Sequence, residues 1–510
     1  MAMRPSQRAS FTPQPEPAPV RAGRERLAFN LGAAGTVPSR SIVEAAIARE
    51  ARPTFATAAY AEPRDWGYRG LMLFTAVLLL RPQDQIPGLN SLHLAEICAF
   101  LGIAPMLLHR LAHRLPVFRI TPETVGLIAF GMVILATAPF SIWPGGAFRT
   151  FTDAYLKIVI VFVLMMNTLT TTKRLEWLTW LILVSCGYIA ARAVFDYIRG
   201  VHIVEGGRVA GSISGIFGNP NDLALNMVTF LPPAIVITIG RQSAAYKRLI
   251  AAFICMLMLG AIVSTMSRGG VLGLLVMFAA LVLLGGKVRP GFGAIAVAMV
   301  LCATPFLPSS FWTRMDSIFN EDVDRSHFTG SREARQVVMK EGFDTFLEFP
   351  LTGVGAGQFK NYNPQQRKER WRETHNALLQ VASETGVFGV AAFLFLIGSG
   401  ARCAAATRRM LARPRGDRAD PLRLVMSDED RRYLYSHTVA MTAGLIGWFV
   451  CAFFASVAYN WTFYYLLALI VAGRELTRDR LAAGRAIEAQ ARGVSIPSPG
   501  RPRGTARGAA

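Results

Sequence analysis

Charge and cysteine are both scarce in this chain. Only 17% of its 510 residues are Asp, Glu, Lys or Arg and six are cysteines, whereas 52% are hydrophobic. All six cysteines fall inside or beside apolar stretches, so the pattern indicates neither a disulfide framework nor a cysteine metal cluster. Residues 1–65 are rich in Pro, Arg and Ala and lack the apolar core of a cleaved signal peptide. The first apolar stretch is therefore expected to direct membrane insertion itself.

Apolar blocks dominate the rest of the chain. Most are close to the roughly 17–25 residues that a helix needs to cross a bilayer, and they predict an all-α polytopic membrane protein with about 12 transmembrane helices. The predicted spans are 70–81, 91–109, 122–141, 153–170, 175–198, 221–239, 247–266, 269–285, 291–307, 376–399, 436–457 and 460–473. The resulting regions are a disordered basic tail (1–69), nine spans (70–307), a long polar segment (308–375), three further spans (376–473) and a second disordered basic tail (474–510).

The formal net charge of +21 would indicate nucleic-acid binding in a soluble protein, but its distribution here gives it another meaning. Residues 1–69 carry ten Lys/Arg against six acids, residues 400–435 nine against five, and residues 474–510 eight against three. With twelve spans these segments share one side, which the positive-inside rule assigns to the cytoplasm. We therefore expect cytoplasmic termini, an outward-facing 308–375 segment, and no nucleic-acid partner.

Ionisable residues within or beside the spans gather toward the outer ends in this topology. They are His93, Glu96, Asp153, Lys157, Arg192, Asp196, Asp222, Arg268 and His375. Isolated charges facing lipid are costly, so this crowding predicts a shared polar cavity in the outer leaflet. A structural alternative is that Asp153 with Lys157, and Arg192 with Asp196, form neutralising i,i+4 pairs. Glu384, nearer the middle of its span, is expected to have a buried functional or network role.

Two outer turns carry an arginine near polar side chains. Arg208 precedes the sequence Phe217–Asp222, in which Asn219 and Asn221 offer amide groups and a helix N-cap. A glycine-rich turn before a helix is able to hold phosphate, although such turns also simply reverse the chain. Arg268 lies in the next tight outer turn, where its guanidinium suits bidentate binding of a diphosphate or, alternatively, snorkels to lipid headgroups.

The 308–375 segment holds further candidates. A helix is predicted from Arg335 to Glu348, and a glycine-rich run beginning at Pro350 breaks it. That run resembles a nucleotide-binding loop only superficially, because no strand precedes it. The acidic run Glu321–Asp324 is predicted to be a solvated turn rather than a metal site.

A histidine stands where this polar segment meets the next apolar helix. His375-Asn376 leads into the span without a spacer, and several arginines precede it. An ionisable group at such a boundary is costly unless it is used or paired, so the combination predicts chemistry on an anionic, membrane-bound substrate. With an unperturbed pKa of about 6.5, His375 is a candidate general base, and a local backbone contact is the alternative. Asn376 either orients the histidine or caps the helix.

The order of these motifs resembles the O-antigen ligase and polymerase superfamily. The resemblance covers roughly residues 70–473. It is carried by Arg208 with Gly218–Asn221, Ser267–Gly269, Arg335 before Pro350, Gly353–Gly357, and His375-Asn376 followed by Gly386 and Gly389. The family often has an aromatic residue four positions after its loop arginine, where this chain has Met339. Arg332 is therefore an alternative to Arg335 as that arginine.

The resemblance implies a metal-independent glycosyltransferase of the lipid-donor (GT-C-like) class, without a cofactor. Such an enzyme takes an undecaprenyl-diphosphate-linked glycan on the periplasmic face of the bacterial inner membrane and transfers it to a hydroxyl group. The acceptor would be a lipid A core, another lipid-linked repeat or a protein, and polysaccharide-assembly proteins are candidate partners. The growing negative charge of the leaving diphosphate must be stabilised, so Arg208, Arg268 and Arg335 or Arg332 are the candidates for binding it. His375 is the candidate for removing the acceptor proton, and Asn376, Glu384, Asn219 and Asn221 are expected to be supporting residues.

A transporter or flippase of an anionic lipid-linked saccharide is the competing function class. It would also place arginines in a cavity, but it would more plausibly show repeated halves with helices interrupted at the midplane. The sequence shows no internal repeat, so glycan transfer is the main hypothesis.

Overall fold

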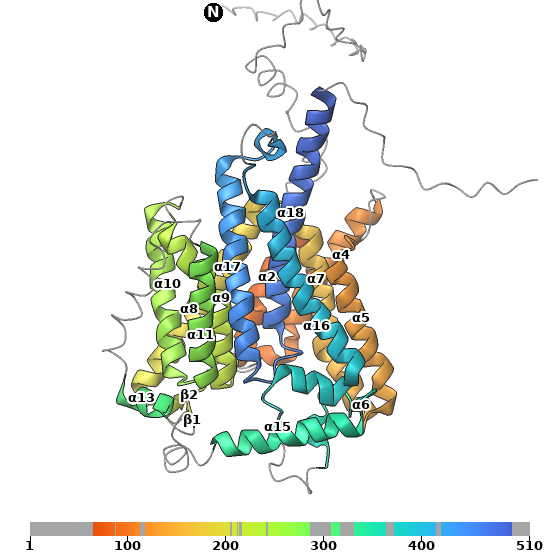
Figure 1. Ribbon diagram of the computed structural model, residues 1–510, viewed down its shortest axis with the longest axis vertical. Coiled ribbons are helices and arrows are strands. Elements are labelled where there is room, and N and C mark those ends of the chain that lie inside the picture. The colour runs from red at the N-terminus through yellow and green to blue at the C-terminus, as the bar shows by residue number, and fades with distance from the viewer. Residues whose placement is uncertain are drawn as a thin grey trace, which may run out of the picture. The chain divides into compact units, whose positions relative to one another are not determined.

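The described part of the chain is almost entirely helical (Figure 1). The computed structural model describes residues 65–86, 88–112, 118–204, 207–211, 213, 217–240, 243–285, 308–316, 331–363, 372–414 and 420–491, except for the side chains of residues 90, 91, 331 and 332. All of these residues belong to one unit of the chain.

Sequence-encoded caps set several helix boundaries. Thr121, Thr171, Asn219 and Ser427 each accept a hydrogen bond from a first-turn amide of the helix that follows. The helices are α2 (Trp66–Leu80), α3 (Pro82–Gln85), α4 (Leu94–Ala112), α5 (Pro122–Thr137), α6 (Pro144–Thr150), α7 (Leu156–Thr168), α8 (Thr172–Arg199), α9 (Pro220–Ile239), α10 (Ala245–Ser264), α11 (Arg268–Gly285), α13 (Ser309–Asp316), α15 (Ser331–Glu348), α16 (Ala377–Leu411), α17 (Asp428–Ala452) and α18 (Trp461–Ala491). Strands β1 (Ile203–Val204) and β2 (Arg208–Val209) form a short antiparallel hairpin in which Ile203 pairs with Val209.

Nine helical stretches within the described ranges are long and apolar enough to cross a membrane. They are Leu94–Ala112, Pro122–Phe140, Pro144–Thr168, Thr172–Arg199, Pro220–Ile239, Ala245–Ser264, Arg268–Gly285, Ala377–Leu411 and Asp428–Ala452. This confirms an all-α polytopic membrane protein, and the nine coincide with nine of the twelve predicted spans. The predicted spans 70–81 and 460–473 form α2 and α18, which are not among the nine, and 291–307 lies outside the described residues.

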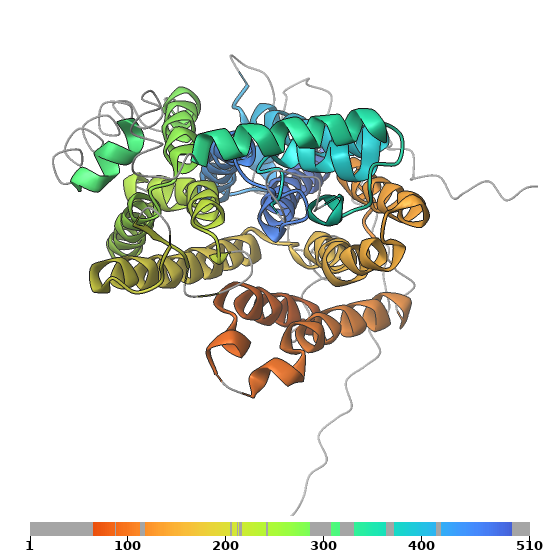
Figure 2. The same ribbon diagram turned by 90° about the horizontal axis from the view of Figure 1, so that it is seen from below.

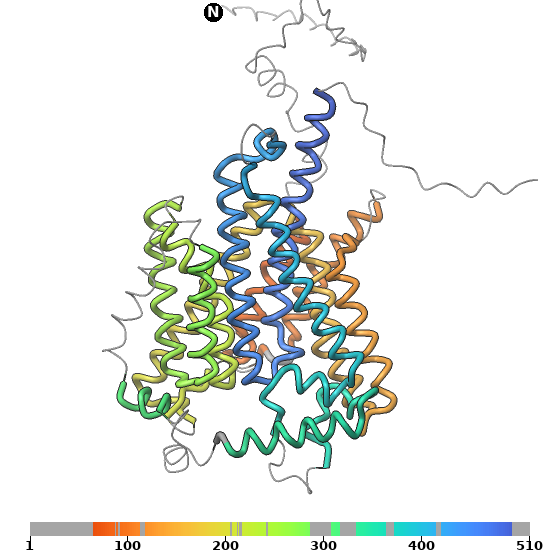
Figure 3. The backbone as a smooth tube through the Cα atoms, in the orientation of Figure 1, coloured from red at the N-terminus to blue at the C-terminus, as the bar shows by residue number. Residues whose placement is uncertain are grey.

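The spans run side by side, while α15 crosses them at one end (Figures 1 and 3). Seen from that end, α15 lies over the tips of several spans (Figure 2). Helix α17 packs against α9, α11, α16 and α18. Its approach to α9 is close enough to require glycine, since a Cβ on Gly444 would lie 2.5 Å from the Thr229 carbonyl oxygen. We call the end that α15 crosses the α15 end.

Ion pairs tie the helices together at the opposite end. Arg474 of α18 binds Glu123 of α5 through two bonds of 2.8 and 2.7 Å, and Lys247 of α10 binds Glu176 of α8 at 2.7 Å. Helix α18 continues to Ala491, so the predicted disorder from residue 474 is wrong for residues 474–491. The extension has partners beyond Arg474, because Arg119 binds Glu475 and Asp479, and Gly484 packs against Pro421.

The predicted i,i+4 charge pairs are not formed. Lys157 instead binds Glu96 of α4 at 2.6 Å, because residues 151–155 adopt a π-helical turn that changes the local register. The carboxylate of Asp196 binds His202 at 3.1 Å, since the chain turns back after α8 ends. Lys157 and Asp196 thus have partners other than the predicted ones, whereas Asp153 accepts a hydrogen bond from Thr152 and Arg192 donates one to Tyr188.

Candidate functional site

The β-hairpin and the starts of α9 and α11 meet around the side chain of Asn221. Its Oδ1 accepts hydrogen bonds from Arg208 Nη2 (2.7 Å) and Ser267 Oγ (2.9 Å). Arg208 Nε also donates to the carbonyl of Thr265 at 3.1 Å. Asn219 has a different role, since its Oδ1 accepts from the Asn221 amide at the helix start (2.9 Å). Thus Asn221 orients the arginine, whereas Asn219 caps α9.

His375 lies just before α16 with its backbone in the left-handed conformation (φ +51°). Its amide donates to Ser456 Oγ at 2.9 Å, and Thr374 Oγ1 donates to the carbonyl of Asn376 at 3.0 Å. The Asn376 side chain accepts from the Leu379 amide at 3.0 Å and so caps α16. Of the two roles considered for Asn376, the geometry supports capping.

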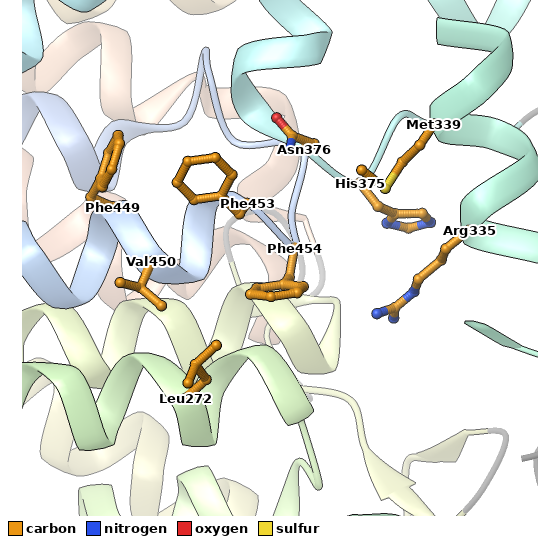
Figure 4. Close-up of a pocket in the computed structure, with 9 residues that line it drawn as sticks. All are labelled: Leu272, Arg335, Met339, His375, Asn376, Phe449, Val450, Phe453 and Phe454. Carbon is orange, nitrogen blue, oxygen red and sulfur yellow. The ribbon is translucent and has the colours of Figure 1, made fainter. Parts of the chain in front are cut away.

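A pocket of about 410 Å³ opens beside this histidine (Figure 4). Its polar lining comes from Arg335, His375 and Asn376, and Figure 4 shows Arg335 and His375 next to each other on one side. The remaining lining residues are apolar: Leu272 of α11, Met339 of α15, and Phe449, Val450, Phe453 and Phe454 in or just after α17. The pocket therefore combines a cationic side with an apolar wall.

Positive charge surrounds the histidine. The pKa of His375 is lowered to about 4, first by burial and then by the guanidinium groups of Arg335, Arg372 and Arg208. Its imidazole is consequently neutral at neutral pH and able to accept a proton. The sequence analysis, which used the unperturbed pKa, did not anticipate this shift. Burial also raises the pKa of the neighbouring Glu373, against the opposing charge of Lys360.

The other predicted arginines differ in how they relate to the pocket. Arg268 is the first residue of α11 and lies one helical turn before the pocket residue Leu272, so both occupy the same side of the helix. Arg335 lines the pocket directly. Arg332 belongs to the first turn of α15, but its side chain lies outside the described part of the structure.

The glycine-rich run after α15 packs against α16. The amides of Val354 and Gly355 donate to the carbonyls of Ser383 and Glu384, both at 2.9 Å, and the Gly357 amide donates to Glu384 Oε2 at 2.8 Å. These amides are therefore occupied by protein acceptors. The run is a structural contact to α16, in agreement with the prediction that it is not a nucleotide loop.

The sequence analysis counted Arg372 among the arginines that precede His375 but gave it no role in the diphosphate site, and it did not include Ser456. Arg372 carried a signal in its closeness to His375 along the chain, whereas Ser456 lies 81 residues away and gave none. The acidic run Glu321–Asp324 lies outside the described residues. Within the described ranges, no three His, Cys, Asp or Glu side chains gather where they could hold a metal ion.

Comparison with known proteins adds one assignment. Residues 253–394 match the family model described as O-antigen ligase. The matched range includes Arg268, Arg335, His375 and Glu384, whereas Arg208 precedes it. No curated protein matches the chain significantly. The match over residues 253–394, together with the order of the motifs and the membrane-spanning helices, supports membership of the chain in the O-antigen ligase and polymerase superfamily.

Proposed function

We propose that the protein transfers a glycan from an undecaprenyl diphosphate carrier to a hydroxyl acceptor. The observation that carries the proposal is the pocket in which His375 and Arg335 face an apolar wall. A lipid-linked diphosphate matches this lining, because it has a charged head for the cationic side and an apolar chain for the apolar wall. Arg208 and Arg372 lie close enough to His375 to lower its pKa, so they extend the cationic side.

The arginines would stabilise the leaving group. Transfer breaks the bond between the anomeric carbon and the diphosphate oxygen, and that oxygen keeps the electron pair. Guanidinium groups stabilise the growing negative charge through charge-assisted hydrogen bonds, which are strongest where water is scarce. Arg208 is held for this task by Asn221. We propose Arg335, Arg208 and Arg268 as the diphosphate clamp, with Arg372 as an additional member.

His375 would act as the general base. The acceptor oxygen bonds to the anomeric carbon while its proton moves to the neutral imidazole. A pKa of about 4 makes the free enzyme's imidazole a weak base. Binding of an anionic diphosphate offsets the charge of the surrounding arginines, so it raises this pKa and strengthens the base when the donor is present.

We further propose that the α15 end faces the periplasm and that the ion-paired end faces the cytoplasm of a bacterial inner membrane. The excess of basic residues in 1–69, 400–435 and 474–510 supports this orientation through the positive-inside rule. Both termini would then be cytoplasmic.

Three acceptors fit the proposal equally well: a lipid A core, a second lipid-linked repeat, and a protein hydroxyl. The family match favours an enzyme over the transporter alternative. Glycan analysis of a deletion strain would separate the acceptors. Loss of glycan from lipid A would indicate a lipid A core as the acceptor, and accumulation of single repeats would indicate a second lipid-linked repeat. Unmodified protein would indicate a protein hydroxyl.

A direct test uses the purified protein in lipid nanodiscs with an undecaprenyl-diphosphate-linked glycan and each acceptor class. Mass spectrometry should detect a new glycosidic product together with free undecaprenyl diphosphate. Movement of the donor across proteoliposomes without any covalent product would overturn the proposal and support a transporter.

A further inference from the structure

Helix α16 is interrupted at Gly386, where φ is +66° and ψ is −164°. Only glycine readily adopts this conformation. The interruption removes regular helical hydrogen bonds, and a distant loop replaces them. The Val387 amide donates to the carbonyl of Pro350 at 2.8 Å, while the carbonyl of Ser383 accepts from the Val354 amide at 2.9 Å. The loop after α15 thus completes the backbone bonding of α16.

The side chain of Glu384 makes a second connection to the same loop. The residue is 3% exposed, and its carboxylate accepts hydrogen bonds from the amides of Gly357 (2.8 Å) and Phe359 (3.4 Å). Its carbonyl also accepts from the Gly355 amide at 2.9 Å. Burying a carboxylate without hydrogen-bond partners costs free energy. The two carboxylate oxygens of Glu384 therefore stabilise the loop in the position that supplies these amides.

The loop in turn supports α15. Val338 of α15 packs with Val354 and Phe359 of the loop in a small buried cluster. Val338 lies about one helical turn after Arg335, so the cluster supports the part of α15 that carries the arginine. A second support is at Gly342, where a Cβ would lie 3.0 Å from Leu379 Cδ2 and 3.2 Å from Thr374 Cγ2.

We propose that Glu384 is a positioning residue for the transfer reaction. By holding the Gly353–Phe359 loop on α16, it fixes α15 so that Arg335 lies beside His375 on the same side of the pocket. This inference rests on the function proposed above for its kinetic consequence, but the positional claim can be measured without substrate.

The first experiment is hydrogen exchange on Glu384→Gln and Glu384→Ala in nanodiscs. The glutamine keeps one acceptor oxygen and turns an NH₂ group toward a backbone donor, whereas alanine removes both bonds. Exchange of the Gly357 and Phe359 amides should rise by roughly 2- to 10-fold in the alanine variant, the range expected for loss of a hydrogen bond to each amide. Peptides from residues 331–348 should also exchange faster, with glutamine intermediate.

Glu123→Gln is the matched control, because Glu123 is also a buried carboxylate but binds Arg474 at the opposite end. It should leave exchange in residues 331–348 unchanged even where it lowers thermal stability. Unchanged exchange of residues 331–348 in both Glu384 variants would overturn the positional claim. Because glutamine preserves the size of the side chain, it keeps the test available if the alanine variant does not fold.

The second experiment measures kinetics with the lipid-linked donor. A misplaced Arg335 should raise the donor KM and lower kcat, by up to roughly 100-fold for a displacement of about 1 Å. The control Glu123→Gln should leave the donor KM unchanged. Any fall in its apparent kcat should match the loss of folded, active protein. Faster exchange in residues 331–348 without a change in KM would refute the positioning role. Absence of transfer by the wild-type protein would refute the proposed function and leave the exchange result standing.

Discussion

Arg208 Nη2 and Asn221 Oδ1 are joined by a 2.7 Å hydrogen bond between the β-hairpin and the start of α9. The same oxygen accepts from Ser267 Oγ at 2.9 Å, which brings in the turn before α11. Three chain segments thus share one amide oxygen. Arg208 is therefore oriented before any ligand arrives, which reduces the entropy lost on binding.

Asn221→Ala should weaken donor binding through Arg208. Loss of a hydrogen bond to a charged group costs about 1.5–3 kcal/mol, so we expect the donor KM to rise roughly 10-fold or more. Arg208→Ala should be at least as harmful, and the double variant should be no worse than Arg208→Ala alone. Additive effects in this double-mutant cycle would contradict an action of Asn221 through Arg208.

His375→Asn should abolish transfer while leaving the protein folded. Asparagine tolerates the left-handed conformation at this position better than alanine, so the variant isolates loss of the imidazole. A general base contributes about 10²–10⁴-fold, which sets the expected fall in kcat. Asn376→Ala serves as the comparison, since loss of its cap should mainly reduce stability by about 1 kcal/mol. Wild-type transfer by His375→Asn would rule out the base role.

The pH dependence should reveal the charges around the histidine. Transfer needs neutral His375, so activity should fall as pH drops through its pKa. The acidic limb of kcat/KM, which reports the free enzyme, should lie near the pKa of about 4. The acidic limb of kcat should lie at higher pH, because the bound diphosphate offsets the arginine charges. Arg335→Gln should move the kcat/KM limb upward, and an unchanged limb would argue against this electrostatic coupling.

Arg268→Lys should be nearly as harmful as Arg268→Ala. A lysine ammonium keeps the charge but cannot make the two parallel hydrogen bonds by which a guanidinium binds a diphosphate. Donor KM and kcat of the two variants provide the comparison. Full activity of the lysine variant would instead assign Arg268 to a lipid headgroup contact.

Transfer should continue in excess chelator. In the proposed mechanism, arginines supply the positive charge for which many nucleotide-sugar enzymes use a divalent cation. Replacing Asp322 and Asp324 with Asn should accordingly cost little activity. Loss of transfer with chelator and its return with magnesium or manganese would show that a cation shares the clamp.

Much of the fold followed from hydropathy, because a membrane span must be long, apolar and hydrogen-bonded within itself. The sequence also predicted that α15 ends at Glu348, because Pro350 follows. It further predicted that Arg208 lies near the 219–221 turn. It did not reveal that Gly386 interrupts a span, because a single glycine in an apolar run leaves no trace in hydropathy. The sequence also could not predict the partners of Lys157 and Glu384, because each residue and its partner lie on segments far apart in the sequence.

The shared backbone bonds between α16 and the loop after α15 also affect how this protein can be recombined with its relatives. Exchange of the polar segment 308–375 is an obvious way to transplant acceptor preference. Such a graft would leave Ser383, Glu384 and Val387 facing a loop that does not offer matching partners. The natural module boundary therefore lies beyond Val387, inside a transmembrane helix, and chimeras joined there should fold more often than chimeras joined at the membrane surface.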